Sequence, residues 1–117
     1  MSYDSSNIFA KILRGEIPCS KVYEDEKVLA FNDINPKGPI HVLVVPKQSF
    51  VSLVDFCEQA PAEDVSSFFR KVTELSHELG LNDQGFRMVA NVGPDSGQEV
   101  PHFHVHLIGG KRLGPMA

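Results

Sequence analysis

The chain has no tryptophan and only two cysteines, Cys19 and Cys57, among its 117 residues. The cysteines are not in a CxxC arrangement and are too few for a disulfide framework, so we expect free thiols in a reducing compartment. Long hydrophobic runs are lacking, because an apolar stretch such as 42–45 is far too short to span a membrane. The first ten residues have neither the basic start nor the apolar run of a signal peptide. These absences predict a cytoplasmic protein.

Positive charge is also scarce. Lysine and arginine number 11 against 15 aspartates and glutamates, which gives a net charge of −4. This balance disfavours nucleic acid or an anionic membrane as the partner. Because 42% of the residues are hydrophobic, a chain of this length can build one core. We therefore predict a single domain over residues 1–117, with 111–117 as a C-terminal tail, that binds neither nucleic acid nor membrane.

The hydrophobic pattern predicts an α+β fold. Ser5 or Ser6 is the expected N-cap of a first helix that ends near Gly15, and apolar residues at helical spacing predict a long helix from about residue 62 to 79. Two strands are expected within 21–33 and one each at 40–46, 86–92 and 102–108. Because several strands are joined by short turns, we expect a mostly antiparallel sheet.

The stretch "PHFHVHLIGG" at residues 101–110 carries three of the five histidines, His102, His104 and His106. Alternate side chains of a strand face the same way, so the three imidazoles would line one face. The apolar residues between them would then face the core. We expect the imidazoles to face outward into a shared groove.

Three interpretations of this row are open on the residues alone. A solvated edge strand is the plainest, but such strands typically carry lysine, glutamate and threonine. A zinc site is the second; the outer two Cα atoms would be about 13 Å apart, so one pair together with His41 would have to supply the ligands. Nucleophilic catalysis is the third, in which a neutral central imidazole attacks while its neighbours handle charge and protons. Catalysis explains the arrangement best.

These residues resemble the histidine-triad (HIT) motif, His-φ-His-φ-His-φ-φ, where φ is apolar. The segments "NIFAKILRGEIPCSKVYED", "LAFNDINPKGPIHVLVVPK" and "NVGPDSGQEVPHFHVHLIGG" resemble those of its Hint branch in the same order. The pair Gly109–Gly110 and the short tail also look like Hint rather than the dinucleoside polyphosphate hydrolases. The hexose-phosphate uridylyltransferases differ, because they have glutamine at the third triad position.

The resemblance implies a five-stranded antiparallel sheet with two helices, and a homodimer joined through the long helix and the strand at 86–92. It implies hydrolysis of the P–N bond of adenosine phosphoramidates, an AMP- or GMP-like purine nucleotide as the bound group, and neither a cofactor nor a metal. By position, His104 would be the nucleophile that forms a nucleotidyl-histidine. His102 would orient it and link to His41, and His106 would contact the phosphate.

The resemblance also implies a nucleotide pocket. Asp33 would accept hydrogen bonds from the ribose hydroxyls, although an aspartate here also suits a turn. The purine slot would be lined by Ile8, Phe9, Phe31, Ile34 and Leu43. On sequence alone, such apolar residues would more often belong to the core. The phosphate region would be held by Asn91, Gly97 and Gln98, and Glu99 and Val100 would also belong to the substrate-binding residues.

Two residues depart from the family pattern. Glu99 stands where serine is frequent, and its carboxylate would repel a phosphate unless it is turned away. Pro101 stands where tyrosine is frequent and is tolerable as the first residue of a strand. Two other functions stay open on the sequence: a non-catalytic nucleotide-binding partner protein, and a dinucleoside polyphosphate hydrolase.

Overall fold

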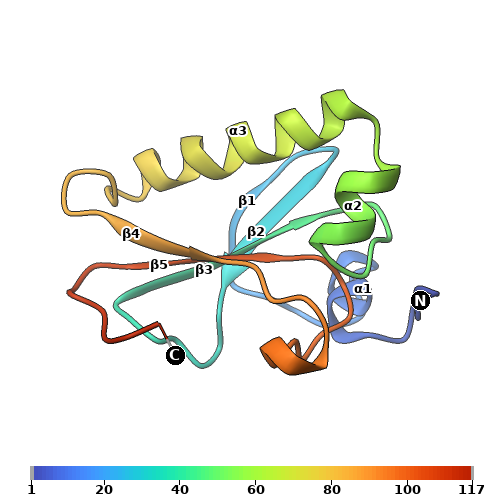
Figure 1. Cartoon of the computed structure of the whole chain (residues 1–117), viewed down its shortest axis with the longest axis horizontal. Coiled ribbons are helices and arrows are strands. Elements are labelled where there is room, and N and C mark those ends of the chain that lie inside the picture. The colour runs from blue at the N-terminus through green and yellow to red at the C-terminus, as the bar shows by residue number, and fades with distance from the viewer. Residues whose placement is uncertain (1, 117) are drawn as a thin grey trace.

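The computed structural model describes residues 2–116, and over this range it contains three α-helices and five strands. The helices are α1 (Ile8–Leu13), α2 (Leu53–Gln59) and α3 (Ala62–Glu78), and Pro94–Ser96 forms a short 3-10 helix. The strands are β1 (Lys21–Glu24), β2 (Val28–Asn32), β3 (Ile40–Pro46), β4 (Phe86–Val89) and β5 (Val105–Gly109). They form one antiparallel sheet in the order β1-β2-β3-β5-β4 (Figure 1). The predicted α+β fold with a five-stranded antiparallel sheet is confirmed.

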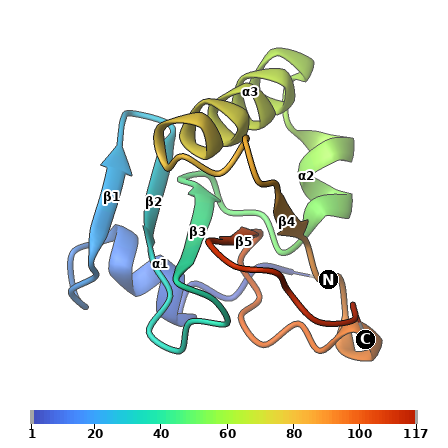
Figure 2. The same cartoon turned by 90° about the vertical axis from the view of Figure 1, so that its left-hand side faces the viewer.

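The two faces of the sheet are covered by different helices (Figure 2). α2 and α3 lie over one face, the α3 face, whereas the shorter α1 lies against the other, the α1 face. The register explains the division, because Val42 is opposite Leu107 while its neighbour Leu43 is opposite His106. Residues directly opposite one another share a face, so each strand sends alternate side chains to the two sides. The main core is thereby separated from the histidines.

The core on the α3 face is built around three phenylalanines. The Phe103 ring stacks on Phe56 of α2 at 4.8 Å between centroids and contacts Phe68 of α3 at 5.2 Å. All three side chains are at most 2% exposed. Burying side chains of this size stabilises a fold by about 1.5–3 kcal/mol each. Phe103 thus anchors the histidine segment to the rest of the domain.

The helices differ from prediction in two respects. The predicted fold has two helices, and α2 is the third. Its signal is the capping box at Ser52 and Asp55, in which each side chain accepts a backbone N–H at the helix start. With only seven residues, α2 is too short for a clear hydrophobic period. The N-cap of α1 is Asn7 rather than Ser5 or Ser6, because the Asn7 side chain accepts from the Ala10 N–H at 2.9 Å.

The last two strands are shorter than predicted. β4 ends at Val89, and β5 begins at Val105, so His102 and His104 precede the strand. The Phe103 N–H bonds to the Phe50 carbonyl at 2.7 Å instead of entering the ladder. Alternation of the side chains nevertheless persists, with Phe103 on the α3 face and its histidine neighbours on the other.

Within residues 2–116, the structure has no helix with both the length and the apolar composition needed to cross a lipid bilayer.

Candidate active site

Four histidines gather on the α1 face, where β3 and β5 run side by side. β3 supplies His41 and β5 supplies His106, whose ring centroids are 5.2 Å apart. The ring of His104 lies 5.1 Å from that of His106. His102 and His104 come from the extended segment that enters β5. The structure therefore brings together all four residues that the sequence assigned to catalysis.

The histidines are less open than the sequence predicted. His102 is fully buried, His104 is 7% exposed and His41 is 5% exposed, while His106 is half-buried. The segment up to α1 covers this face, and the Phe9 ring meets His104 edge-on at 4.9 Å. The predicted outward-facing row of three imidazoles is wrong for His102 and His104, because α1 packs over them.

The hydrogen bonds of His102 and His104 determine which ring nitrogens carry protons. Nε2 of His102 lies 2.8 Å from the Pro46 carbonyl oxygen, which can only accept, so this nitrogen carries the proton. Nδ1 of the same ring lies 2.7 Å from the hydroxyl of Tyr3. Nδ1 of His104 lies 2.6 Å from the His102 carbonyl oxygen and must donate to it. In a neutral His104 ring, Nε2 is therefore left with a free lone pair.

A second set of hydrogen bonds assigns the opposite state to His106. The Lys37 backbone N–H donates to Nδ1 of His41 at 3.0 Å, so in the neutral ring Nε2 of His41 carries the proton. That nitrogen lies 2.9 Å from Nδ1 of His106, which accepts from it. Nε2 of His106 then carries an N–H. The predicted link from His102 to His41 is wrong, because His41 bonds to His106.

Burial keeps all four rings neutral near pH 7. Desolvation is the main cause that lowers the pKa of each ring, because the interior disfavours the charged form. The pKa of His106 falls to about 4, with further contributions from the neighbouring His104 and His41. Asp33 opposes the decrease in His41, His104 and His106 but does not reverse it. Two adjacent neutral rings thus present a lone pair on His104 and a donor on His106.

Asp33 lies at the edge of this cluster, directly after β2. One carboxylate oxygen accepts from the Asn35 N–H at 2.7 Å, which is the turn contact expected of an aspartate in this position. The other oxygen lies 3.4 Å from Nε2 of His41. The ligand atoms of Asp33, His41 and His106 all lie within 4.8 Å of one another, as a metal site requires. A divalent ion here would use one triad histidine, whereas the sequence suggested two.

The predicted base pocket is brought together in part. Phe9, Phe31 and Leu43 are buried in one cluster, where the rings of Phe9 and Phe31 meet edge-on at 5.4 Å and Val100 packs against the group. Ile8 is 44% exposed, and Ile34, on the loop after β2, is 89% exposed. These two lie outside the buried cluster.

The loop between β4 and β5 is braced from within. The Gln98 side-chain amide donates to the carbonyls of Val51 and Val100 at 2.7 and 3.1 Å, and its oxygen accepts from the Gly93 N–H at 2.9 Å. Gly97 has a φ of 81°, a conformation that favours glycine. Asn91 is half-buried and Glu99 is exposed. Gln98, predicted as a phosphate contact, uses these side-chain groups to shape the loop.

Tyr3 is the site residue that sequence reasoning missed. Its hydroxyl reaches His102, which lies 99 residues further along the chain. A tyrosine hydroxyl that enters the interior typically has a hydrogen-bond partner, but nothing in the sequence identifies a partner at this separation. Only the packing of the N-terminal segment on the α1 face brings the two together.

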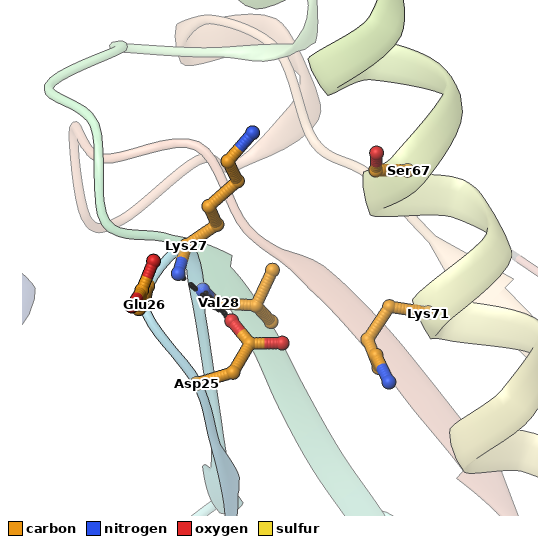
Figure 3. Close-up of a pocket in the computed structure, with 6 residues that line it drawn as sticks. All are labelled: Asp25, Glu26, Lys27, Val28, Ser67 and Lys71. Atoms are coloured by element: carbon orange, nitrogen blue, oxygen red, sulfur yellow. Dashed lines mark hydrogen bonds between the residues drawn. The ribbon is translucent and has the colours of Figure 1, made fainter.

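A separate hollow lies between the β1–β2 turn and α3 (Figure 3). It is lined by Asp25, Glu26, Lys27, Val28, Ser67 and Lys71. Its main charged groups already have partners: Lys27 pairs with Asp64 at 2.8 Å, and Lys71 pairs with Glu74 at 2.6 Å. The Asp25 carboxylate accepts two backbone N–H groups of its own turn. The hollow therefore offers no reactive group comparable to the histidines.

Comparison with known proteins identifies the family. The HIT domain family model matches residues 14–113. An uncharacterised 13.2 kDa HIT-like protein of Azospirillum brasilense is 50% identical over 115 residues, 98% of this chain and 94% of the relative. The purine nucleoside phosphoramidase of Escherichia coli K12 is 39% identical over 112 residues, 93% of this chain and 91% of the relative. The structure of a HIT family hydrolase from Clostridium thermocellum is 36% identical, with a TM-score of 0.85 and 96% of each chain covered.

The chain belongs to the HIT domain family and has the fold of its hydrolases.

The buried histidines make stability depend on pH. Because the pKa of His106 falls from 6.5 to about 4 on folding, its neutral form stabilises the native state fully above pH 6.5, and this contribution is lost as the pH falls toward 4. We expect His106→Gln to flatten the decrease in unfolding free energy over this range by about 1 kcal/mol per pH unit. Urea denaturation at several pH values measures the slope. Equal slopes in the parent protein and in His106→Gln would contradict the assignment.

Proposed function

We propose that this chain hydrolyses the P–N bond of purine nucleoside 5'-phosphoramidates of the AMP-amine type. The observation that carries the proposal is the pairing of a free lone pair on Nε2 of His104 with an N–H on Nε2 of the adjacent His106. A nucleophile and a donor to the phosphoryl oxygens are the two groups such a transfer needs. The activity named for the Escherichia coli relative supports the same reaction.

The reaction has two steps. Nε2 of His104 attacks the α-phosphorus, the bond from phosphorus to the amine nitrogen breaks, and the amine leaves with a proton from the histidine network. Water then attacks the phosphorus of the nucleotidyl-histidine and returns one proton to the histidine network; the bond from phosphorus to Nε2 breaks, which releases the nucleotide and restores the neutral imidazole. His106 donates its N–H to the phosphate in both steps, and His41 keeps that donor in place. Burial favours the attack, because it keeps the rings neutral, so the lone pair on Nε2 of His104 is unprotonated at pH 7.

The nucleotide would lie over the α1 face. We propose that the purine contacts the cluster of Phe9, Phe31 and Leu43 and is flanked by the exposed side chains of Ile8 and Ile34. The Asp33 carboxylate oxygen that does not bond to Asn35 would accept hydrogen bonds from the ribose hydroxyls. The phosphate would approach the loop between β4 and β5, where the proposed contacts are Asn91, Gly97 and Gln98. Glu99 and Val100 complete the proposed substrate-binding residues, with Val100 beside the apolar cluster.

The zinc interpretation remains as a second candidate because of one observation. Asp33, His41 and His106 have ligand atoms close enough to share one divalent ion. Imidazole and carboxylate are both zinc ligands. An ion held by the two nitrogens that now bond to one another would replace the hydrogen bond between His41 and His106, while Nε2 of His106 would still carry its proton.

We further propose that the chain forms a homodimer through β4 and α3 in the cytoplasm. β4 is an edge strand that pairs only with β5 among the described residues, and it carries Phe86 and Met88 at 36% and 48% exposure. An uncovered strand edge with apolar side chains readily pairs with a second copy. The free thiols of Cys19 and Cys57 suit a reducing compartment.

Substitution of the nucleophile tests the reaction. We expect His104→Ala to lower turnover of an adenosine phosphoramidate at least about a thousandfold, while AMP binding persists, because the attacking nitrogen is lost but the apolar cluster remains. Steady-state kinetics and rapid-quench labelling of the adduct on residue 104 measure the loss. His77→Ala, which removes an exposed histidine outside the cluster, is the matched control and should keep full activity.

Four results would point elsewhere. Equal turnover by the parent protein and His104→Ala would remove the proposed mechanism, and absent turnover with intact AMP binding would favour the non-catalytic alternative. Activity that is lost with EDTA and restored by zinc would favour the metal site. Faster cleavage of a diadenosine polyphosphate than of the phosphoramidate would favour a dinucleoside polyphosphate hydrolase.

A charge on the β4 edge tests the dimer. We expect Met88→Glu to convert a dimer into a monomer at micromolar concentration, because each copy would then place a charged carboxylate in an apolar interface. Analytical ultracentrifugation measures the mass. Val54→Glu introduces the same charge at a 50% exposed position of α2 and should remain dimeric. A parent protein that sediments as a monomer would contradict the proposal.

A further inference from the structure

Tyr3 reaches the histidine site from the other end of the chain. It lies in the segment before α1, and its hydroxyl is 2.7 Å from Nδ1 of His102. The two rings also meet edge-on, with centroids 5.6 Å apart. The contact is partly buried, so the hydrogen bond is only partly open to competition from water.

The direction of this hydrogen bond follows from the other contact of the same ring. The Pro46 carbonyl oxygen requires a proton on Nε2 of His102, and in a neutral ring Nδ1 is then an acceptor. The phenol O–H of Tyr3 therefore donates. The His102 ring is held at both nitrogens, by a strand residue on one side and by the N-terminal segment on the other.

Holding this ring also places the backbone of residue 102. His102 and His104 lie outside the β5 ladder, so strand pairing does not fix the carbonyl that bonds to Nδ1 of His104. The Phe103 N–H bond to Phe50 and the two contacts of the His102 ring hold this segment instead. Loss of the Tyr3 hydroxyl would free one side of the ring.

We propose that Tyr3 is a positioning residue: its O–H fixes the ring of His102, whose carbonyl then keeps the proton of His104 on Nδ1 and leaves Nε2 free to attack. The effect on rate rests on the proposed function, whereas the hydrogen bond and the ring states it sets do not. Tyr3 does not touch the reacting atoms and acts only through His102.

Tyr3→Phe isolates the hydroxyl, because phenylalanine keeps the ring that packs on His102. The segment should remain placed, since the Asn7 side chain donates to the Asp4 carbonyl at 2.8 Å independently of Tyr3. The chain has only one other tyrosine, Tyr23, whose hydroxyl donates to Asp25 at 2.8 Å in the β1–β2 region. Tyr23→Phe is therefore a matched control that removes a hydrogen-bonded hydroxyl away from the histidines.

The first measurement is nitrogen-15 NMR of the histidine rings near pH 7, with signals assigned by single histidine substitutions. In the parent protein and in Tyr23→Phe, we expect Nδ1 of His102 to resonate as a hydrogen-bonded acceptor and Nε2 to carry the proton. In Tyr3→Phe, the Nδ1 signal should move to that of an unbonded nitrogen or show a changed tautomer. An unchanged Nδ1 signal in Tyr3→Phe would overturn the inference.

The second measurement is the kinetics of phosphoramidate hydrolysis. We expect Tyr3→Phe to lower kcat about tenfold with KM within about twofold, because the loss affects the orientation of the nucleophile and not the nucleotide pocket. Unchanged kcat, despite an altered ring signal, would overturn the positioning role. If the parent protein does not hydrolyse the substrate, the proposed function fails, and the NMR result still decides whether Tyr3 fixes the ring.

Discussion

The proposed chemistry depends on one hydrogen bond, from Nδ1–H of His104 to the backbone carbonyl of His102, at 2.6 Å. A neutral imidazole carries one N–H proton on one of its two nitrogens, and this carbonyl places the proton of His104 on Nδ1. The position of the proton matters only in a neutral ring, because a charged imidazole carries protons on both nitrogens and has no free lone pair. Desolvation of His104 and His106 ensures neutrality, so the packing of α1 and the hydrogen bond work together.

The two faces of the sheet have different roles: one holds the main core, and the other carries the histidines proposed for catalysis. Phe103 packs against α2 and α3 and holds the histidine segment in place, while the residues on either side of it face α1. Alternation of side chains therefore links a rigid aromatic core directly to the reactive groups. Such support from a packed layer is what a site needs if its atoms are to keep their positions within fractions of an ångström.

The fold was largely predictable because its signals are local. Apolar residues at helical spacing gave α3, and alternating runs gave the strands, but α2 is too short for a period and was missed. The gathering of His41 with the triad was expected from the family resemblance. Two features were not accessible: the burial of His102 and the contact with Tyr3, because both arise when the N-terminal segment packs on residues about a hundred positions away. The partner of His41, carried over from the family resemblance, was assigned wrongly, because the pairing of β3 with β5 brings His41 to His106.

Three of the groups that set the ring states are main-chain atoms: the Lys37 N–H and the carbonyls of Pro46 and His102. Replacing a side chain at any of these positions leaves its peptide dipole in place, except where proline removes the N–H of residue 37. Most side-chain substitutions at these positions would therefore leave the protonation pattern of the rings unchanged. Two side chains also pair with the rings, the phenol of Tyr3 and the imidazole of His41, so substitutions at positions 3 and 41 are the ones that can change this pattern.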